Sequence, residues 1–287
     1  MQIEAVADYS CVCGEGPLWH PDERAVYWAD IPQGRLFRLT IADGRHEPVY
    51  ADRPVGGFTL QADGALLLFR DRGNVVVWSG GAERRTLVAE IPELSGTRFN
   101  DVCADPEGRV FCGTMSGPDV TGRLYRLDPD GRRHRLLEDQ GTPNGMGFSP
   151  DLRRLYYNDS RAGRTWVFDY DRATGSISNQ RIFRDAVASG DPGRPDGLAV
   201  DAEGYVWTAQ WDGGALLRFD PEGRLVRRLE MPARKITSLC FAGDGLTEIY
   251  ATSAGGGNRP ADGAQAGALF RILGAGVRGM PRFRSRL

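Results

Sequence analysis

The stretch Arg194-Pro195-Asp196-Gly197, followed by the apolar run 198–200, decides the fold of this chain because its pattern recurs. Five other segments place a short apolar run and then a turn rich in Pro, Asp or Gly after an equivalent position. The six positions that align in this way are Glu15, Gly56, Asn100, Asn144, Asp196 and Thr237. They lie 41, 44, 44, 52 and 41 residues apart, which is the repeat length of β-propeller blades. We call these six residues the slot residues.

The segments between the slot residues consist of short strand-like runs separated by turns. The runs are rich in β-branched and aromatic residues and are bounded by Gly, Pro and Asp, as is typical of all-β proteins. They cover residues 25–29, 35–39, 65–69, 75–78, 109–112, 123–127, 155–157, 165–169, 205–208, 215–219, 248–252 and 268–272. Six units of about four strands predict an all-β fold, a six-bladed β-propeller, with residues 1–287 as a single domain. The N-terminal run 3–7 has no unit of its own, so we expect it to add a strand to the last blade and close the ring.

The overall composition is ordinary for a soluble globular protein. Hydrophobic residues make up 41% and charged residues 26% of the chain, and the formal net charge is −2. This balance gives no reason to expect nucleic acid or an anionic membrane as a partner, and no apolar run approaches the length of a membrane span. Residues 1–8 lack the basic and apolar regions of a signal peptide. We therefore expect a cytoplasmic protein, and both a monomer and a homodimer are compatible with the sequence.

The cysteines and histidines do not form a recognisable metal motif. The five cysteines, at positions 11, 13, 103, 112 and 240, include no two pairs at zinc-site spacing, and the three histidines lie far apart. A zinc centre of the Cys or His type is therefore not expected. The cysteines are better explained as small residues buried in strands.

The slot residues carry the functional argument. The innermost strand of each propeller blade lies along the central channel, so residues just before these strands should form a ring at one mouth of the channel. Four of the six have oxygen-bearing side chains: Glu15, Asn100, Asn144 and Asp196. Turn formation alone would explain Asn-Gly and Asp-Gly pairs, but it would not explain a glutamate in one slot and Gly or Thr in two others. Carboxylate and amide oxygens without sulfur or imidazole suit Ca²⁺, Mg²⁺ or Mn²⁺.

Arg98 precedes Asn100 by two residues and should lie on the same rim. A guanidinium group there suits polar, hydroxyl-rich or anionic substrates. Trp211, in the segment after residue 208, is a candidate for the rim of the pocket, with its aromatic face against sugar C–H groups. Packing between blades is the alternative explanation for this tryptophan.

The chain resembles the SMP30/gluconolactonase/regucalcin-like lactonases over almost its whole length. The most specific shared motifs are Gly14-Glu15-Gly16-Pro17, Thr97-Arg98-Phe99-Asn100-Asp101, Gly113-Thr114-Met115, Asn144-Gly145, Tyr157-Asn158-Asp159-Ser160, Pro195-Asp196-Gly197 and Asp201-Ala202-Glu203-Gly204. The resemblance implies a six-bladed propeller with one divalent metal held by Glu15, Asn144 and Asp196. It also implies that Arg98 and Asn100 contact the substrate, that Asp196 is the general base, and that the substrate is a sugar lactone. Ca²⁺ is the expected metal, with Mg²⁺, Mn²⁺, Zn²⁺ and Fe²⁺ as alternatives.

One segment departs from the family pattern. Regucalcin-type members carry a substrate-binding glutamate shortly after the Gly-Thr-Met motif, where this chain has Ser116-Gly117-Pro118-Asp119. Asp119 is the candidate to replace that glutamate.

The sequence thus favours a metal-dependent hydrolase that opens the ester ring of a sugar lactone by attack of water. Two alternatives remain open. The same fold and metal could act on aryl esters, aromatic lactones or organophosphates, or the protein could be a non-catalytic, calcium-binding propeller.

Overall fold

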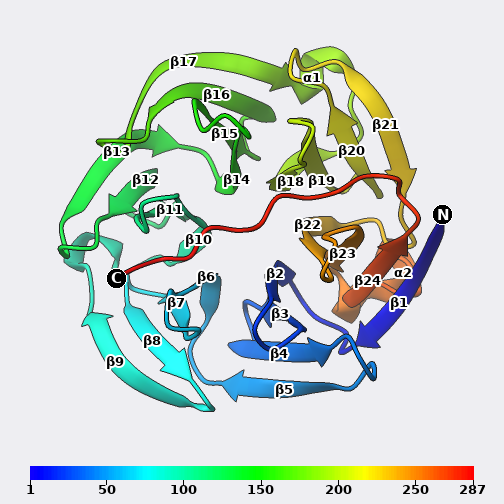
Figure 1. Cartoon of the computed structure of the whole chain (residues 1–287), viewed down its shortest axis with the longest axis horizontal. Helices are drawn as coiled ribbons and strands as arrows, with labels where there is room; N and C mark the ends of the chain where they lie inside the picture. The colour runs from blue at the N-terminus through cyan, green and yellow to red at the C-terminus, as the bar shows by residue number, and fades with distance from the viewer.

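The computed structural model describes residues 1–287 as six four-stranded antiparallel sheets arranged in a ring (Figure 1). The prediction of a six-bladed β-propeller is confirmed. Strands β2, β6, β10, β14, β18 and β22 are the innermost of their blades and surround the central channel.

From the inside outwards, the first blade consists of β2 (Gly14–His20), β3 (Ala25–Asp30), β4 (Arg35–Thr40) and β5 (His46–Ala51). The second consists of β6 (Val55–Leu60), β7 (Leu66–Arg70), β8 (Val75–Ser79) and β9 (Ala82–Val88). The third consists of β10 (Phe99–Ala104), β11 (Val110–Thr114), β12 (Gly122–Leu127) and β13 (Arg133–Gln140). The fourth blade consists of β14 (Pro143–Phe148), β15 (Arg154–Asp159), β16 (Arg164–Asp171) and β17 (Ser176–Asp185). The fifth consists of β18 (Arg194–Val200), β19 (Val206–Trp211), β20 (Ala215–Phe219) and β21 (Leu225–Glu230). The last consists of β22 (Ile236–Ala242), β23 (Glu248–Ser253), β24 (Ala268–Leu273) and β1 (Gln2–Asp8). The short helices are η1 (Pro92–Leu94), α1 (Ala186–Ser189), η2 (Gly256–Asn258) and α2 (Arg259–Asp262). None of them is long and apolar enough to cross a membrane.

The last blade closes the ring with both ends of the repeat region. β1 pairs antiparallel with β24, with Gln2 opposite Leu273 and Asp8 opposite Ala268. The expectation that the N-terminal run completes the last blade is therefore confirmed. This pairing covers an edge of β24 that would otherwise present unpaired backbone groups to solvent.

The core lies between the blades, where apolar side chains of adjacent sheets pack together. In one cluster, Leu18 and Tyr27 of the first blade pack with Phe58, Leu68 and Trp78 of the second. Burial of a large apolar side chain of this kind stabilises the fold by about 1.5–3 kcal/mol. The inner two or three strands of each blade are accordingly almost fully buried, and these are the strands that the sequence pattern predicts.

The slot residues lie inside the innermost strands, not just before them as predicted. In every blade the pairing register shifts at or next to the slot residue, for example between Glu15 and Leu18 and between Pro195 and Leu198. Such β-bulges bend a strand and turn a side chain away from the regular alternation. The bulges explain how residues within a strand can point towards the mouth of the channel.

Glycines after the slot residues allow adjacent innermost strands to approach closely. A Cβ atom on Gly145 would lie 2.1 Å from the backbone nitrogen of Leu198, and one on Gly197 would lie 2.1 Å from Oγ of Ser238. Only glycine fits at these two positions without moving a neighbouring strand.

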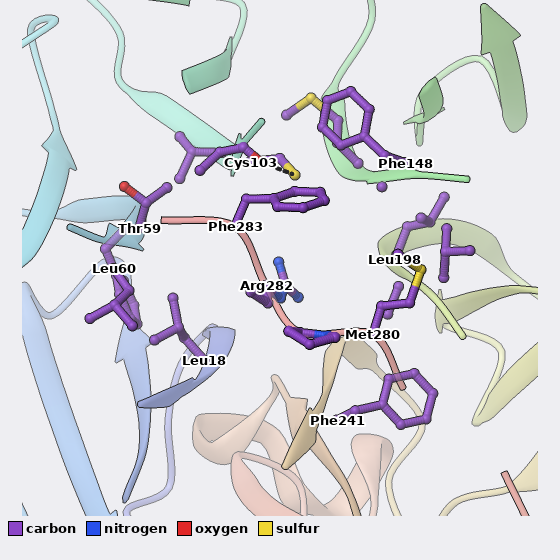
Figure 2. Close-up of a pocket in the computed structure, with 18 residues that line it drawn as sticks. Leu18, Thr59, Leu60, Cys103, Phe148, Leu198, Phe241, Met280, Arg282 and Phe283 are labelled. Carbon is purple, nitrogen blue, oxygen red and sulfur yellow. Dashed lines mark hydrogen bonds between the residues drawn. The ribbon is translucent and has the colours of Figure 1, made fainter. Parts of the chain in front are cut away.

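The C-terminal segment 274–287 crosses the opposite mouth of the channel (red in Figure 1). Gly279 forms a bridge with Asp201 and Ser285 forms one with Gln61, and both partners follow the ends of innermost strands. Figure 2 shows Met280, Arg282 and Phe283 of this segment beside a mostly apolar cavity of about 70 Å³. The polar slot residues lie at the other mouth, so the functional site belongs there.

Candidate active site

A cavity of about 330 Å³ lies at the mouth formed by the starts of the innermost strands. This volume is at the lower end of the range typical of small-molecule pockets, ~300–1,000 Å³. The cavity is lined by six of the seven predicted site residues: Glu15, Arg98, Asn100, Asn144, Asp196 and Trp211. They come from four blades, and the ring geometry brings them together.

A chain of hydrogen bonds orients the two amides. Arg98 Nη1 donates to Asn100 Oδ1 at 2.7 Å, and Asn100 Nδ2 donates to the carbonyl of Pro143 at 2.7 Å and to Asn144 Oδ1 at 3.1 Å. Asn144 Nδ2 in turn donates to Ser160 Oγ at 2.8 Å. An amide oxygen accepts two hydrogen bonds or ligand contacts. Oδ1 of Asn144 therefore retains one lone pair for a further partner.

The two slot carboxylates are buried without a cationic partner. Glu15 is 4% and Asp196 3% exposed, and Oε2 of Glu15 accepts only the backbone N–H of Gly16, at 2.9 Å. Burial, together with the nearby charges of Asp196 and Asp101, raises the pKa of Glu15 well above its usual range. Burial and the charge of Asp101 raise the pKa of Asp196 in the same way, against the opposing effect of Arg98. Neither carboxylate therefore forms an ion pair within the protein, and the charge of Arg98 offsets their shifts only in part.

Asp101 is an acidic residue near the site that sequence reasoning missed. Burial raises the pKa of its carboxyl to about 6, although Arg282 and Arg98 oppose the shift. Four of the six slot residues are followed by glycine, whereas Asn100 is followed by this aspartate. That substitution within the repeat was the signal that could have identified it.

The residues present fit a hard divalent cation only if an amide oxygen takes part. The structure contains no group of three or more His, Cys, Asp and Glu side chains that could hold a metal. Glu15 and Asp196 supply two carboxylates, and Oδ1 of Asn144, which retains a lone pair, is a candidate third protein ligand. Two unpaired buried carboxylates and an oriented amide oxygen form the kind of oxygen-donor set that Ca²⁺, Mg²⁺ and Mn²⁺ prefer.

Asp119 lies outside the cavity, so the idea that it replaces the family glutamate is not supported by its position. Its side chain is exposed, and a hydrogen bond from the Gly117 N–H to the Val120 carbonyl closes a short turn that holds it at the surface. Met115 lines the cavity from this segment instead.

Trp211 lines the cavity, which agrees with its prediction as a residue of the pocket rim. Its backbone is paired with Arg194 across β18 and β19, and Nζ of Lys235 lies 5.6 Å from the centroid of its ring. Arg194 and Arg161 also line the cavity. Sequence reasoning missed both because nothing distinguishes them among the many arginines of the chain.

Fold and site together define a six-bladed β-propeller with an acidic, oxygen-donor cavity at one mouth of its channel. The chain belongs to the SMP-30/gluconolactonase/LRE-like family, whose sequence model matches residues 13–255. It is 43% identical over 292 residues to pentonolactonase XacC of Haloferax volcanii, with 99% of this chain and 98% of that protein covered.

Two solved structures are also similar along their whole lengths. A luciferin-regenerating enzyme has a TM-score of 0.91 and 29% identity and covers 100% of this chain and 99% of its own. Regucalcin from Agrobacterium tumefaciens, described as a calcium-binding protein, has a TM-score of 0.89 and 28% identity, with 99% and 97% covered. The family match and the identity to a pentonolactonase support an enzyme of the lactonase type.

Proposed function

We propose that this chain hydrolyses a sugar lactone with the help of one divalent cation held by Glu15, Asn144 and Asp196. The observation that carries the proposal is the pair of buried carboxylates without an ion pair, facing an oriented amide in an open cavity. The 43% identity to a pentonolactonase supports the substrate class. The calcium-binding description of a 28% identical structure supports the cation.

A bound divalent cation would polarise the lactone carbonyl and lower the pKa of a coordinated water. The side chains of the cavity have separate tasks around it. Asp196 has two carboxylate oxygens, so one can face the cation while the other accepts a proton from the attacking water. Water adds to the carbonyl carbon, the bond from this carbon to the ring oxygen breaks, and the proton passes to the leaving oxygen to give a hydroxy acid.

Arg98 and Asn100 position the substrate. Arg98 retains guanidinium donors beyond those that contact Asn100 and the carbonyl of Phe99, and these can bind hydroxyl groups of a sugar ring. The face of Trp211 provides an apolar surface for sugar C–H groups. We expect Ca²⁺ as the cation because all three ligands are hard oxygen donors, with Mg²⁺, Mn²⁺, Zn²⁺ and Fe²⁺ as alternatives for comparison.

The substrate class can be tested with a panel of five- and six-membered aldonolactones and an aryl ester, compared by kcat/KM with each cation added singly. The proposal predicts a clear preference for an aldonolactone and loss of turnover in Asp196→Ala. A preference for the aryl ester would show that aryl esters, and not sugar lactones, are the substrate class. Cation binding without turnover of any compound would favour a non-catalytic, cation-binding propeller.

A further inference from the structure

Arginines outnumber carboxylates among the residues that line the cavity. Three of its thirteen lining residues are arginines, Arg98, Arg161 and Arg194, and the only other charged ones are Glu15 and Asp196. Since the two carboxylates are the proposed cation ligands, a substrate bound above them meets only guanidinium groups as charged neighbours.

Several arginines of the fourth and fifth blades form ion pairs. Arg164 pairs with Asp185 at 3.0 Å, and Arg184 pairs with Asp191 at 2.5 Å. By contrast, the guanidinium groups of Arg161 and Arg194 make no ion pair and no hydrogen bond within the protein. Both side chains are exposed, and both line the cavity.

Nearby carboxylates have other partners and form no ion pair with these two arginines. Asp159, two residues before Arg161, accepts the backbone N–H groups of Gly141, Thr142 and Ala162 at 2.9, 2.9 and 3.2 Å. Asp212, next to Trp211, pairs with a different arginine, Arg234, at 3.1 Å. The positive charge at the rim is therefore available to a ligand.

The two arginines are fixed to the same side of the site. Arg194 lies two residues before Asp196 in β18, and Arg161 directly follows Ser160, whose Oγ accepts from Asn144 and donates to the carbonyl of Pro195 at 2.6 Å. A ligand group bound by both guanidinium groups would lie beside Asn144 and Asp196, the slot residues of the fourth and fifth blades. It would lie away from Glu15 of the first blade.

We propose that the preferred lactone carries an anionic group, a carboxylate or a phosphate, bound by Arg161 and Arg194 while its ester lies over Glu15, Asn144 and Asp196. The inference rests on the proposed lactone hydrolysis and narrows its substrate class. Guanidinium groups form charge-assisted and often bidentate hydrogen bonds with both kinds of anion. The segment after Met115 contributes no carboxylate to the lining of the cavity, since Asp119 is not among the lining residues, so no carboxylate of that segment repels such a group.

The test compares lactones that differ in charge and little else. D-galactaro-1,4-lactone is compared with D-galactono-1,4-lactone, and 6-phospho-D-gluconolactone with D-gluconolactone, in cation-supplied protein. We expect at least one anionic lactone to have a kcat/KM about tenfold or more above its neutral counterpart. Which of the two does so identifies the anion as a carboxylate or a phosphate. Raising the NaCl concentration from about 0.02 to about 0.3 M should reduce this preference, since the rim is exposed and salt screens it.

Variants of the two arginines test whether these residues cause the preference for the anionic lactone. Arg161→Gln and Arg194→Gln should each raise KM for the preferred anionic lactone about five- to tenfold, with a clearly smaller effect on the neutral lactone. Arg84→Gln, exposed on the outermost strand β9 far from the cavity, should change nothing.

The outcomes separate this inference from the proposed function. Equal kcat/KM for charged and neutral lactones, or arginine variants that affect both alike, would overturn the inference and leave lactone hydrolysis standing. Absence of turnover with every lactone and every cation would instead overturn the proposed function, and the inference with it.

Discussion

The amide nitrogen of Asn100 lies 3.1 Å from the amide oxygen of Asn144, so the side chain of one blade fixes the orientation of its equivalent in the next. The hydrogen bond from Asn144 Nδ2 to Ser160 Oγ holds the same orientation from the other side. The oxygen therefore faces the cavity together with the carboxylates of Glu15 and Asp196. Equivalent positions of different blades thus bring several oxygen donors to one cavity.

This arrangement predicts the effect of Asn100→Ala. Without the Asn100 amide, the Asn144 side chain loses one of the two contacts that orient it, and affinity for the divalent cation should fall about 10–100-fold. Calorimetric titration of metal-stripped protein measures this change. Gln180→Ala, on the exposed outer strand β17, is the control, and unchanged cation affinity in Asn100→Ala would show that the orienting bond is unimportant.

The buried acids predict an unusual pH dependence of stability in the cation-free protein. The pKa of Asp101 is raised from 3.8 to about 6, so the folded state binds more protons than the unfolded state between these values. Stability should therefore fall as pH rises from about 4 to above 6, by on the order of 2–3 kcal/mol for this group. Glu15 and Asp196, whose pKa values are also raised, act in the same direction.

Asp101→Asn tests the contribution of this one residue. It should flatten the pH dependence and raise Tm at about pH 7.5 by a few degrees, as measured by calorimetry on chelated protein. A wild-type Tm that increases between about pH 5 and pH 7.5, or an Asp101→Asn variant less stable than wild type at the upper end of this range, would disprove the assignment.

The close approach of innermost strands predicts a large cost for Gly145→Ala. The added Cβ would lie 2.1 Å from the backbone nitrogen of Leu198, and a backbone atom in a sheet cannot move aside cheaply. We expect a loss of about 3 kcal/mol or more in the free energy of unfolding, measured with denaturant. Gly257→Ala is the matched control, because its added methyl group would have no other atom within 4 Å; similar losses in both variants would argue against a steric cause.

The sequence predicts the inner part of each blade well and the outer part poorly. Strands such as β3, β8 and β23 are buried and rich in β-branched and aromatic residues, which gives a clear pattern. The outermost strand β9, with the sequence AERRTLV, is largely exposed and has no such signal. Its formation depends on pairing with β8, which only the assembled blade provides.

The residues of the candidate site, too, were predicted where they follow the repeat and missed where they do not. The repeat register placed Glu15, Asn144 and Asp196 in one cavity from residues far apart in the chain. It did not identify the β-bulges that orient them, since a bulge is a feature of the pairing between two strands. Arg161 and Arg194 were missed because nothing in the sequence distinguishes them from the other arginines, and Asp101 because it follows a slot residue rather than occupying one. Asp119 does not line the cavity, because the conformation of residues 116–120 leaves its side chain exposed at the surface.

The central claim is that a cation held by Glu15, Asn144 and Asp196 is needed for lactone hydrolysis. The most direct test follows aldonolactone hydrolysis with a pH indicator in exhaustively chelated protein, before and after single additions of Ca²⁺, Mg²⁺, Mn²⁺, Zn²⁺ or Fe²⁺. We predict turnover at the uncatalysed rate without cation, restoration by at least one cation in the wild type, and no restoration in Asp196→Ala. Full activity in the chelated wild-type protein would contradict the account.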